Sequence, residues 1–419
     1  MSHEINKIAI VGAGPVGLLV AILISRLGIP VDLVDVGEGV DMRPRGAAYG
    51  PSAVRVLRRA GVLDQIRANG IELNHFCWRK VSGEWITGLK DCFDETYTDR
   101  FAILPVDKLS MLLYENLKKY PTAKVYWEHN FTGLTQDAEQ VTISTEHKGQ
   151  TKTFTADFLV ACDGGRSGVR RALFGRRFPG HTWEHQIVAT NVRVETTMME
   201  KYGWSDIFWM IDPEYWCVVA KIEASPDVWR VSYGEPGHLD EKELRARCAG
   251  KLAKILPGDP QPGDYELERF SPFKLQQRCA EKMTVGRVTL AGDAAHICNP
   301  IGGYGLTSGI ADIGSLVDCF QGIHEGRASI NILNKYDQSR REKYYTVTDA
   351  LSTANLKRLF LPGDDALMLD PGLQQIAEAA RNPVTAKAYF QASDNLSVDM
   401  TQFWDIKPIQ ENGTTAIHA

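Results

Sequence analysis

The sequence predicts an α/β protein in which a domain built on a parallel sheet carries an inserted antiparallel sheet and ends in a helical segment. Three observations predict this arrangement. The unbroken apolar run at 8–11 is typical of a strand buried on both faces, and the apolar run at 18–27 suits a packed helix. Alternating, aromatic-rich segments within 179–280 indicate an antiparallel sheet that carries one helix. The stretch at 330–359 indicates a helix that is polar on one face.

The turn between the first strand and its helix contains three spaced glycines, Gly12, Gly14 and Gly17. The first permits a tight turn, the second lets a pyrophosphate approach the backbone, and the third lets helix and strand pack closely. The helix N-terminus offers N–H groups to phosphates. The next strand, at 31–34, ends in Asp35, where an acid accepts hydrogen bonds from a ribose. A glycine triplet alone could be an ordinary turn, but this combination predicts a Rossmann-like dinucleotide site.

The composition is that of an ordinary globular protein with room for two or three domains. Of the 419 residues 44% are hydrophobic and 24% charged, and a net charge of −5 without a basic stripe argues against nucleic acid as a partner. The eight cysteines lack metal-binding spacing, so we expect no metal and free thiols in a reducing cytoplasm. We expect no signal peptide and no membrane span. The sequence does not distinguish a monomer from a homodimer.

Two later buried runs also end in an acid. Asp163 precedes a glycine-rich turn, although an Asp-Gly turn by itself is common. Asp293 precedes a proline- and glycine-rich turn at 300–305, from which a helix starts near Leu306. Carboxyl ends of parallel strands meet at one edge of a sheet, so we expect these acids to lie near Asp35. Asp293 could accept a hydrogen bond from a sugar-alcohol hydroxyl, and the helix N-terminus could face an electron-accepting ring.

Three further polar residues lie near these motifs. Arg43 and Arg45 follow the ribose acid, and their planar guanidinium groups suit a pyrophosphate. The alternative for them is a solvated basic loop. His296 lies beside small apolar residues, where a histidine is more often structural than a catalytic base.

The three motifs, in this order, resemble those of the class A flavoprotein monooxygenases, the fold family of aromatic hydroxylases such as p-hydroxybenzoate hydroxylase. The segments 271–273 and 294–296 are most similar to the fungal FAD-dependent monooxygenases of secondary metabolism. The resemblance implies a tightly bound FAD, and NADPH or NADH that docks transiently because the chain has no second nucleotide fold. The residues implied to bind FAD are Gly12, Gly14, Gly17, Asp35, Arg43, Arg45, Ala48, Asp163, Asp293, Gly303, Gly305, Leu306 and Thr307.

The resemblance also implies a reaction. NAD(P)H reduces FAD, the reduced flavin captures O2, and a C4a-hydroperoxide delivers oxygen to an electron-rich aromatic ring, so the hard chemistry belongs to the cofactor. The protein excludes water and positions the ring. The candidates around the reacting carbon are Trp209, Tyr215, Trp216, Pro300 and Tyr304. For each aromatic residue among them, packing in the core is the competing interpretation.

The chain departs from the family pattern at several positions. Asp35 stands where the family usually has Glu, Val106 where many members have Arg or Gln, and Thr307 where Asn is frequent. Ala220 and Ile222 stand where benzoate hydroxylases clamp a carboxylate. We therefore expect a neutral phenol, a polyketide aromatic or an indole rather than a benzoate.

The resemblance also implies a division into domains. We predict an FAD-binding domain at 1–71, 101–178 and 281–345, a substrate-binding β-sheet domain at 72–100 and 179–280, and a C-terminal helical tail at 346–419. The alternatives to a monooxygenase are a flavin dehydrogenase, epoxidase or halogenase on a related fold, or a flavin-binding scaffold without turnover. The Trp-x-Trp-x-Ile-Pro run of a halogenase is not found in the sequence.

Overall fold

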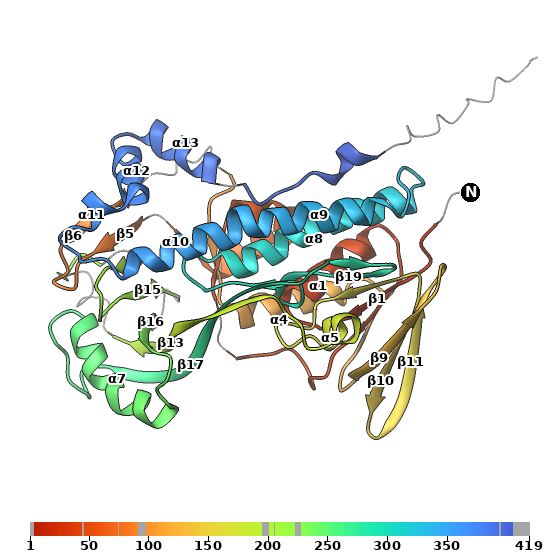
Figure 1. Ribbon diagram of the computed structural model, residues 1–419, viewed down its shortest axis with the longest axis horizontal. Helices are drawn as coiled ribbons and strands as arrows, with labels where there is room; N and C mark the ends of the chain where they lie inside the picture. Colours follow the sequence, from red (N-terminus) through yellow and green to blue (C-terminus); the bar gives the residue numbers. More distant parts are fainter. Residues whose placement is uncertain are drawn as a thin grey trace, which may run out of the picture.

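A computed structural model describes residues 4–43, 46–73, 75–90, 98–194, 201–204, 206–222, 228–393 and 395–404. Figure 1 shows two lobes bridged by long helices that run across the top of both. One lobe holds a parallel sheet and the other a larger sheet that is mainly antiparallel. The expected α/β class and the C-terminal helical segment are confirmed.

The parallel sheet has the strand order β18-β19-β12-β1-β2-β8. Its strands are β1 (Ile8–Val11), β2 (Val31–Val34), β8 (Ala123–Tyr126), β12 (Phe158–Ala161), β18 (Thr284–Val285) and β19 (Val288–Leu290). All pairs are parallel except β18 with β19. β1, β2, β12 and β19 are buried along their whole length, which explains why β1 and β12 are apolar throughout and why β2 and β19 contain only one polar residue each, Asp32 and Thr289.

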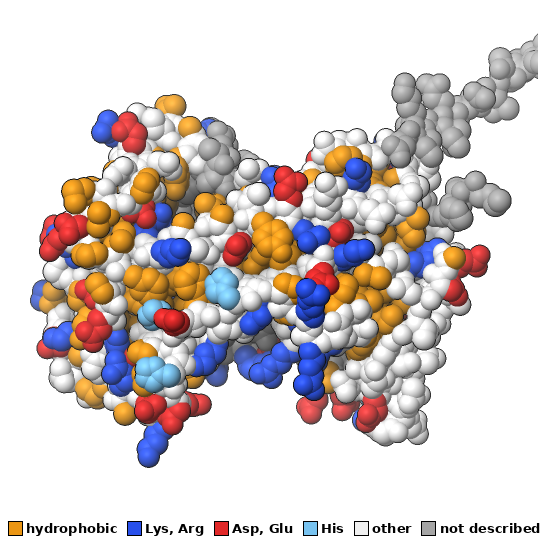
Figure 2. All heavy atoms as spheres, in the orientation of Figure 1, with side chains coloured by type: hydrophobic (Ala, Val, Ile, Leu, Met, Phe, Trp, Pro, Cys, Tyr) orange, Lys and Arg blue, Asp and Glu red, His pale blue; other side chains and the backbone are white. Residues whose placement is uncertain are grey.

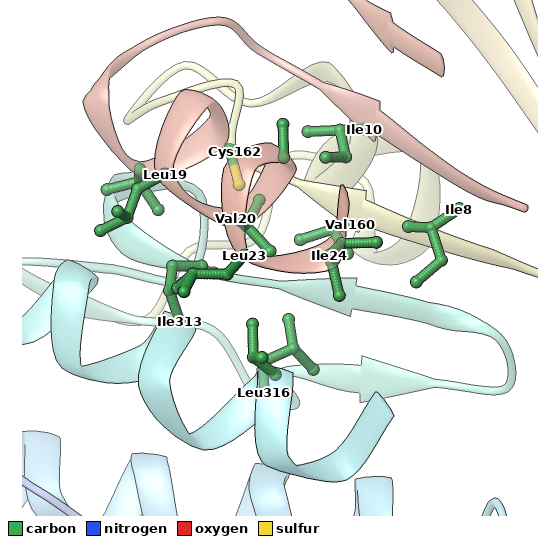
Figure 3. Packing of buried hydrophobic residues seen from close by; sticks show 14 of the residues in the cluster. Ile8, Ile10, Leu19, Val20, Leu23, Ile24, Val160, Cys162, Ile313 and Leu316 are labelled. Atoms are coloured by element: carbon green, nitrogen blue, oxygen red, sulfur yellow. The ribbon is translucent and has the colours of Figure 1, made fainter. Parts of the chain in front are cut away.

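Helices α1 (Pro15–Arg26), α4 (Val106–Leu117) and α8 (Tyr304–His324) pack around this sheet. Figure 3 shows side chains of α1, such as Leu23, directed toward Ile313 and Leu316 of α8, beside Ile8 and Val160 of the sheet. Burial of each such aliphatic side chain contributes about 1.5–3 kcal/mol. This apolar core fixes the two helices whose N-termini border the motifs.

The second sheet has the order β20-β17-β13-β16-β15-β14-β5-β6. Its strands are β5 (His75–Arg79), β6 (Trp85–Lys90), β13 (Gly180–Arg193), β14 (Ile207–Met210), β15 (Cys217–Lys221), β16 (Val228–Pro236), β17 (Glu266–Cys279) and β20 (His296–Ile297). Helix α7 (Glu241–Ile255) covers one face. One pairing differs from the expected antiparallel sheet, since β14 lies parallel to β5. The two strands are far apart in sequence, so no hairpin forces them to be antiparallel.

Shorter elements complete the fold. They are β3 (Ala48–Tyr49), α2 (Pro51–Arg59), α3 (Leu63–Asn69), β4 (Ile71–Glu72), β7 (Ala102–Ile103), β9 (Asn130–Gln136), β10 (Val141–His147), β11 (Gln150–Ala156), α5 (Gly168–Phe174), and the 3-10 turns η1 (Gly292–Ala294) and η3 (Met400–Phe403). After α8 come α9 (Ile332–Lys343), the π-helical turn η2 (Tyr344–Asp349), α10 (Ala350–Leu359), α11 (Ala366–Leu369), α12 (Pro371–Ala379) and α13 (Pro383–Ser393). Within the described ranges no helix has the length and apolar character needed to cross a membrane.

The strands of 72–100 and 179–280 share the second sheet, which is joined at its edge by β20 from the segment 281–345. The boundaries of the three units proposed from the sequence stay a prediction.

Candidate functional site

The three sequence motifs begin at one edge of the parallel sheet. Backbone hydrogen bonds extend the sheet one residue beyond the strands, from Cys162 N to Val11 O (2.7 Å) and from Ala291 N to Ala161 O (3.0 Å). Gly12 N donates to Val34 O at 2.9 Å in the same way. Three turns therefore start side by side at the ends of adjacent strands: the glycine turn, the Asp163 turn and the Asp293 turn.

The glycine turn has the shape of a phosphate cradle. Gly12 has φ 104°, and a Cβ placed on it would lie 2.4 Å from the carbonyl oxygen of Cys162. A Cβ on Gly17 would lie 1.8 Å from the carbonyl oxygen of Gly12. At Gly14, by contrast, no described atom beyond the chain neighbours lies within 4 Å of such a Cβ. Gly14 is the N-cap of α1 without a capping side chain from the described residues, so the space in front of the helix N-terminus suits a pyrophosphate.

Asp35 is held against this turn. Its Oδ2 accepts a hydrogen bond from Ala13 N at 2.6 Å, and its Oδ1 accepts one from Gly37 N at 2.7 Å. Each carboxylate oxygen has a second lone pair that can accept from a ribose hydroxyl. Asp35, which stands where the family usually has the longer Glu, therefore binds the backbone of the glycine turn directly.

Asp163 caps the start of α5 and carries one unsatisfied oxygen. Its Oδ2 accepts from Gly168 N (2.7 Å) and Val169 N (3.1 Å). Its Oδ1 is buried and has no hydrogen-bond partner among the residues that the structure describes. Burial raises the pKa of Asp163, and hydrogen bonds from Ser167 and the backbone partly oppose that effect. A buried polar atom without a partner is costly, so this oxygen fits a site completed by a bound hydroxyl or N–H group.

The Asp293 turn packs against both α1 and α8. Gly292 has φ 59°, and a Cβ on it would lie 3.1 Å from Val16 of α1. A Cβ on Gly309 of α8 would lie 2.9 Å from the Gly292 Cα. Asp293 itself is exposed at the start of this turn. The structure thus brings together all three motifs that the sequence singled out.

The turn before α8 joins the same site from another side. Gly303 has φ 71°, and a Cβ on it would lie 3.8 Å from the carbonyl oxygen of Ala48. Thr307 Oγ1 accepts from Gly50 N at 3.2 Å and donates to Gly303 O at 2.9 Å. β3 and the start of α8 are therefore in contact, as a common ligand requires. The neighbouring candidates Pro300, Gly305 and Leu306 lie on the same turn or in the first turn of α8.

The two arginines of the sequence prediction are not among these contacts. Arg43 pairs with Asp41 at 2.8 Å and is largely exposed. Arg45 lies outside the described residues. Their contact with a pyrophosphate stays a prediction.

An aromatic pair lies on the face of the second sheet that is opposite α7. The ring of Trp209 stacks on Trp78 with centroids 4.9 Å apart and an interplanar angle of 17°, and Phe76 meets it edge-on at 6.1 Å. These three belong to the same apolar cluster as Ala48 and Phe101. The cluster thus connects the aromatic face of the sheet to the segment that contacts the turn before α8.

Helix α10 bridges the aromatic pair and the glycine-rich turn. The guanidinium of Arg358 lies 5.9 Å from the Trp78 ring centroid, and it donates to Asn355 at 2.7 Å. A Cβ on Gly302 would lie 2.6 Å from the Asn355 side-chain nitrogen and 2.7 Å from the Tyr304 ring. Burial raises the pKa of Tyr304.

Of the other two aromatic candidates, Trp216 belongs to the same apolar cluster as the aromatic pair, and Tyr215 lies elsewhere. Trp216 is 1% exposed and fills the space over Gly234, where a Cβ would come within 1.9 Å of its ring, so it packs as core. Tyr215 lies 4.9 Å from Lys251 of α7, on the opposite face of the sheet from Trp209. The structure does not bring Tyr215 to the motifs.

Sequence reasoning missed Arg358 and a second cation, Arg230. Arg230 Nε donates to Asn191 Oδ1 at 2.6 Å, and β16 places Arg230 directly across from Ala220. Burial lowers the pKa of Arg230, while the Asp107 carboxylate opposes that effect. Arg230 is the only charged residue in the stretch 228–233 of β16, and this is the signal that could have identified it.

Comparison with known proteins matches residues 6–350 to the FAD binding domain family. The chain is 34% identical to a para-nitrophenol 4-monooxygenase of a Pseudomonas species over 84% of this chain and 87% of that protein. It is 31% identical to a 6-hydroxy-3-succinoylpyridine 3-monooxygenase of Pseudomonas putida, over 92% and 99% of the two chains. The crystal structure of a p-nitrophenol 4-monooxygenase from Pseudomonas putida superposes with a TM-score of 0.86 at 31% identity, over 94% of this chain and 98% of that one. The fungal character suggested by the sequence is not confirmed.

Proposed function

Because this chain belongs to the FAD-binding family of class A flavoprotein monooxygenases, we propose that it uses NAD(P)H and O2 to hydroxylate a phenol-type aromatic ring. It is a flavoprotein monooxygenase whose cofactor is FAD. Both relatives above are named for hydroxylated aromatic compounds, which supports this substrate class. When bound, FAD supplies the activation of O2, and the protein supplies binding, orientation and exclusion of water.

The proposal assigns the FAD contacts to the motifs. Gly14 and the N-terminus of α1 would take the pyrophosphate, and Asp35 a ribose. The buried oxygen of Asp163 would accept a hydrogen bond from the same ligand, and Asp293 would hold the ribityl chain. These residues fit the group because the cradle at Gly14 is open and Asp163 Oδ1 is unsatisfied within the described part of the chain.

The substrate class depends on the aromatic pair Trp78 and Trp209, which is the observation that carries this proposal. Offset or stacked aromatic faces favour a flat aromatic ring. Residues directly across a ladder share a face, so Arg230 lies on the same side of the sheet as Ala220. A cation there favours an ionised or hydrogen-bonding oxygen on the ring.

Ligand-stimulated oxidation of NADPH tests this function. We expect a subset of phenols to accelerate NADPH consumption by the FAD-loaded protein, with one atom from oxygen-18 gas in each product. A dehydrogenase would give a product without the label, and a scaffold would show no stimulation. The proposal would be contradicted if, across a broad panel, no phenol gave a labelled product or no phenol stimulated NADPH oxidation.

Replacing Trp209 by leucine is expected to raise the KM for a phenolic substrate by about 2- to 10-fold, because aromatic pairs contribute about 0.5–1.5 kcal/mol. Trp204 offers a matched control, since its ring packs on Phe208 and Trp229 on the α7 side of the same sheet. Steady-state kinetics should show a raised KM in Trp209→Leu only. Equal changes in both variants would exclude a specific role for Trp209.

We propose that the surface beside α5 discriminates between NADPH and NADH. Figure 2 shows basic side chains gathered near α5, where the two lobes meet. Arg166 is exposed there, directly after the Asp163 turn. Arg166→Ala is expected to lower the ratio of kcat/KM for NADPH over NADH by about tenfold, because a guanidinium pairs strongly with phosphate. An unchanged ratio would remove Arg166 from the proposed site.

A further inference from the structure

A buried carboxylate lies behind the Asp293 turn and outside the contacts assigned to FAD. Asp312 of α8 is 0% exposed. Its Oδ2 accepts from Gly292 N at 3.0 Å and is 2.8 Å from His296 Nε2. Its Oδ1 accepts from Arg340 Nε at 2.7 Å. One side chain thus joins the backbone of the turn to two buried cationic or polar groups.

This network is fully enclosed. Burial alone favours the neutral acid, but the charges and hydrogen bonds of His296 and Arg340 together lower the pKa of Asp312 below its ordinary value. Arg340 is itself 0% exposed and also donates to the carbonyl oxygen of Leu396 and, at 3.4 Å, to that of Ser308. A buried ion pair is expensive to form, and removing one partner is more expensive still. Such a group is strongly held in one position.

The group that Asp312 holds is the backbone of the turn. Gly292 has φ 59°, and its neighbour in the chain is Asp293. The hydrogen bond to Gly292 N fixes the plane of the peptide from which this turn begins. The ring of His296, at the other end of the turn, packs against Tyr344 of the π-helical turn η2, with centroids 5.3 Å apart and an interplanar angle of 34°. The carboxylate therefore restrains both ends of the segment that carries Asp293.

We propose that Asp312 is a positioning residue for FAD, which holds the Gly292 peptide so that Asp293 faces the cofactor. This rests on the proposed contact of Asp293 with FAD. Asp312 would not touch the cofactor, and its effect would pass through one backbone N–H group. The segment 395–404 takes part, because Leu396 supplies an acceptor for Arg340.

The test compares two acidic residues of the same helix. Asp318 is also largely buried and pairs with an arginine, Arg59, at 2.5 Å, but its contacts lie toward α2 and η3. FAD affinity is measured by flavin fluorescence on the full-length apoprotein, alongside the melting temperature. Asp312→Asn is expected to weaken FAD binding by about tenfold and Asp318→Asn to leave it within about twofold. Equal weakening in both variants, or none in Asp312→Asn, would overturn the proposal.

A second pair covers the case in which Asp312→Asn does not fold. His296→Gln keeps an N–H donor for Asp312, whereas His296→Leu removes it. We expect His296→Gln to retain the FAD affinity of the wild type and His296→Leu to lose it. Equal affinities in the two would overturn the proposal. Normal FAD affinity in Asp293→Ala would count against the assigned role of Asp293 itself, whereas loss in Asp293→Ala with normal affinity in Asp312→Asn would count against Asp312 alone.

Discussion

Replacing Gly14 by alanine is expected to weaken FAD binding by about 10- to 100-fold while the apoprotein stays folded. Gly14 has φ −72°, which any residue adopts, and a Cβ there meets no described atom within 4 Å beyond its chain neighbours. The added methyl group would instead occupy the space that the pyrophosphate needs at the helix N-terminus. Fluorescence titration with FAD and the melting temperature of the apoprotein measure the two effects separately.

Two other glycines serve as controls for this prediction. Gly17→Ala would place a Cβ 1.8 Å from the Gly12 carbonyl oxygen, so it is expected to lower the stability of the apoprotein itself. A Cβ on Gly39 would meet no described atom within 4 Å beyond its chain neighbours, and Gly39 lies outside the glycine turn. Gly39→Ala should therefore change neither the FAD affinity nor the melting temperature of the apoprotein. Wild-type FAD affinity in Gly14→Ala would contradict the assigned phosphate cradle.

Asp293→Ala is expected to yield a folded protein that loses most of its flavin, with FAD affinity reduced by about 10- to 100-fold. The exposed carboxylate lies at the carboxyl edge of the sheet, so its removal leaves the core intact. Asp293→Asn keeps one acceptor oxygen and should fall between the wild type and Asp293→Ala. Flavin content after gel filtration and turnover with added FAD are the measurements.

A distant acid provides the control. Asp137 accepts hydrogen bonds only within its own turn, from Glu139 and Gln140 on the β9–β10 connection, as far as the described residues show. Asp137→Ala should therefore retain its flavin. Full flavin content and normal turnover in Asp293→Ala would show that Asp293 has no part in binding FAD.

The parts of the site that the sequence predicted are those encoded by local pattern. The buried strands of the parallel sheet are short and mostly apolar, and each motif follows such a strand directly, so the common edge of the sheet brings the motifs together. Gly12, Asp35, Asp163 and Asp293 could therefore be placed without knowledge of any long-range contact. The glycine-rich turn before α8 could be placed for the same reason.

The substrate side depends on pairings that no local pattern encodes. The stacking of Trp209 on Trp78 arises from the parallel pairing of β14 with β5, across more than a hundred residues of sequence. Tyr215 lies near Trp216 in sequence but is on the α7 side of the sheet. Arg358 approaches the aromatic pair from α10, a helix whose position follows from tertiary packing. Predicting such contacts requires the register of the whole sheet.

In the arrangement proposed above, three separate segments hold one FAD molecule beside the aromatic face of the second sheet. An experimental structure of the FAD complex is the decisive measurement for this arrangement. We expect the pyrophosphate at Gly14, a ribose hydroxyl on Asp35, the ribityl chain at Asp293, and the isoalloxazine against the turn at Gly303. An FAD molecule bound elsewhere, or one without contacts to Asp35 and Asp293, would show that the three segments do not form its binding site.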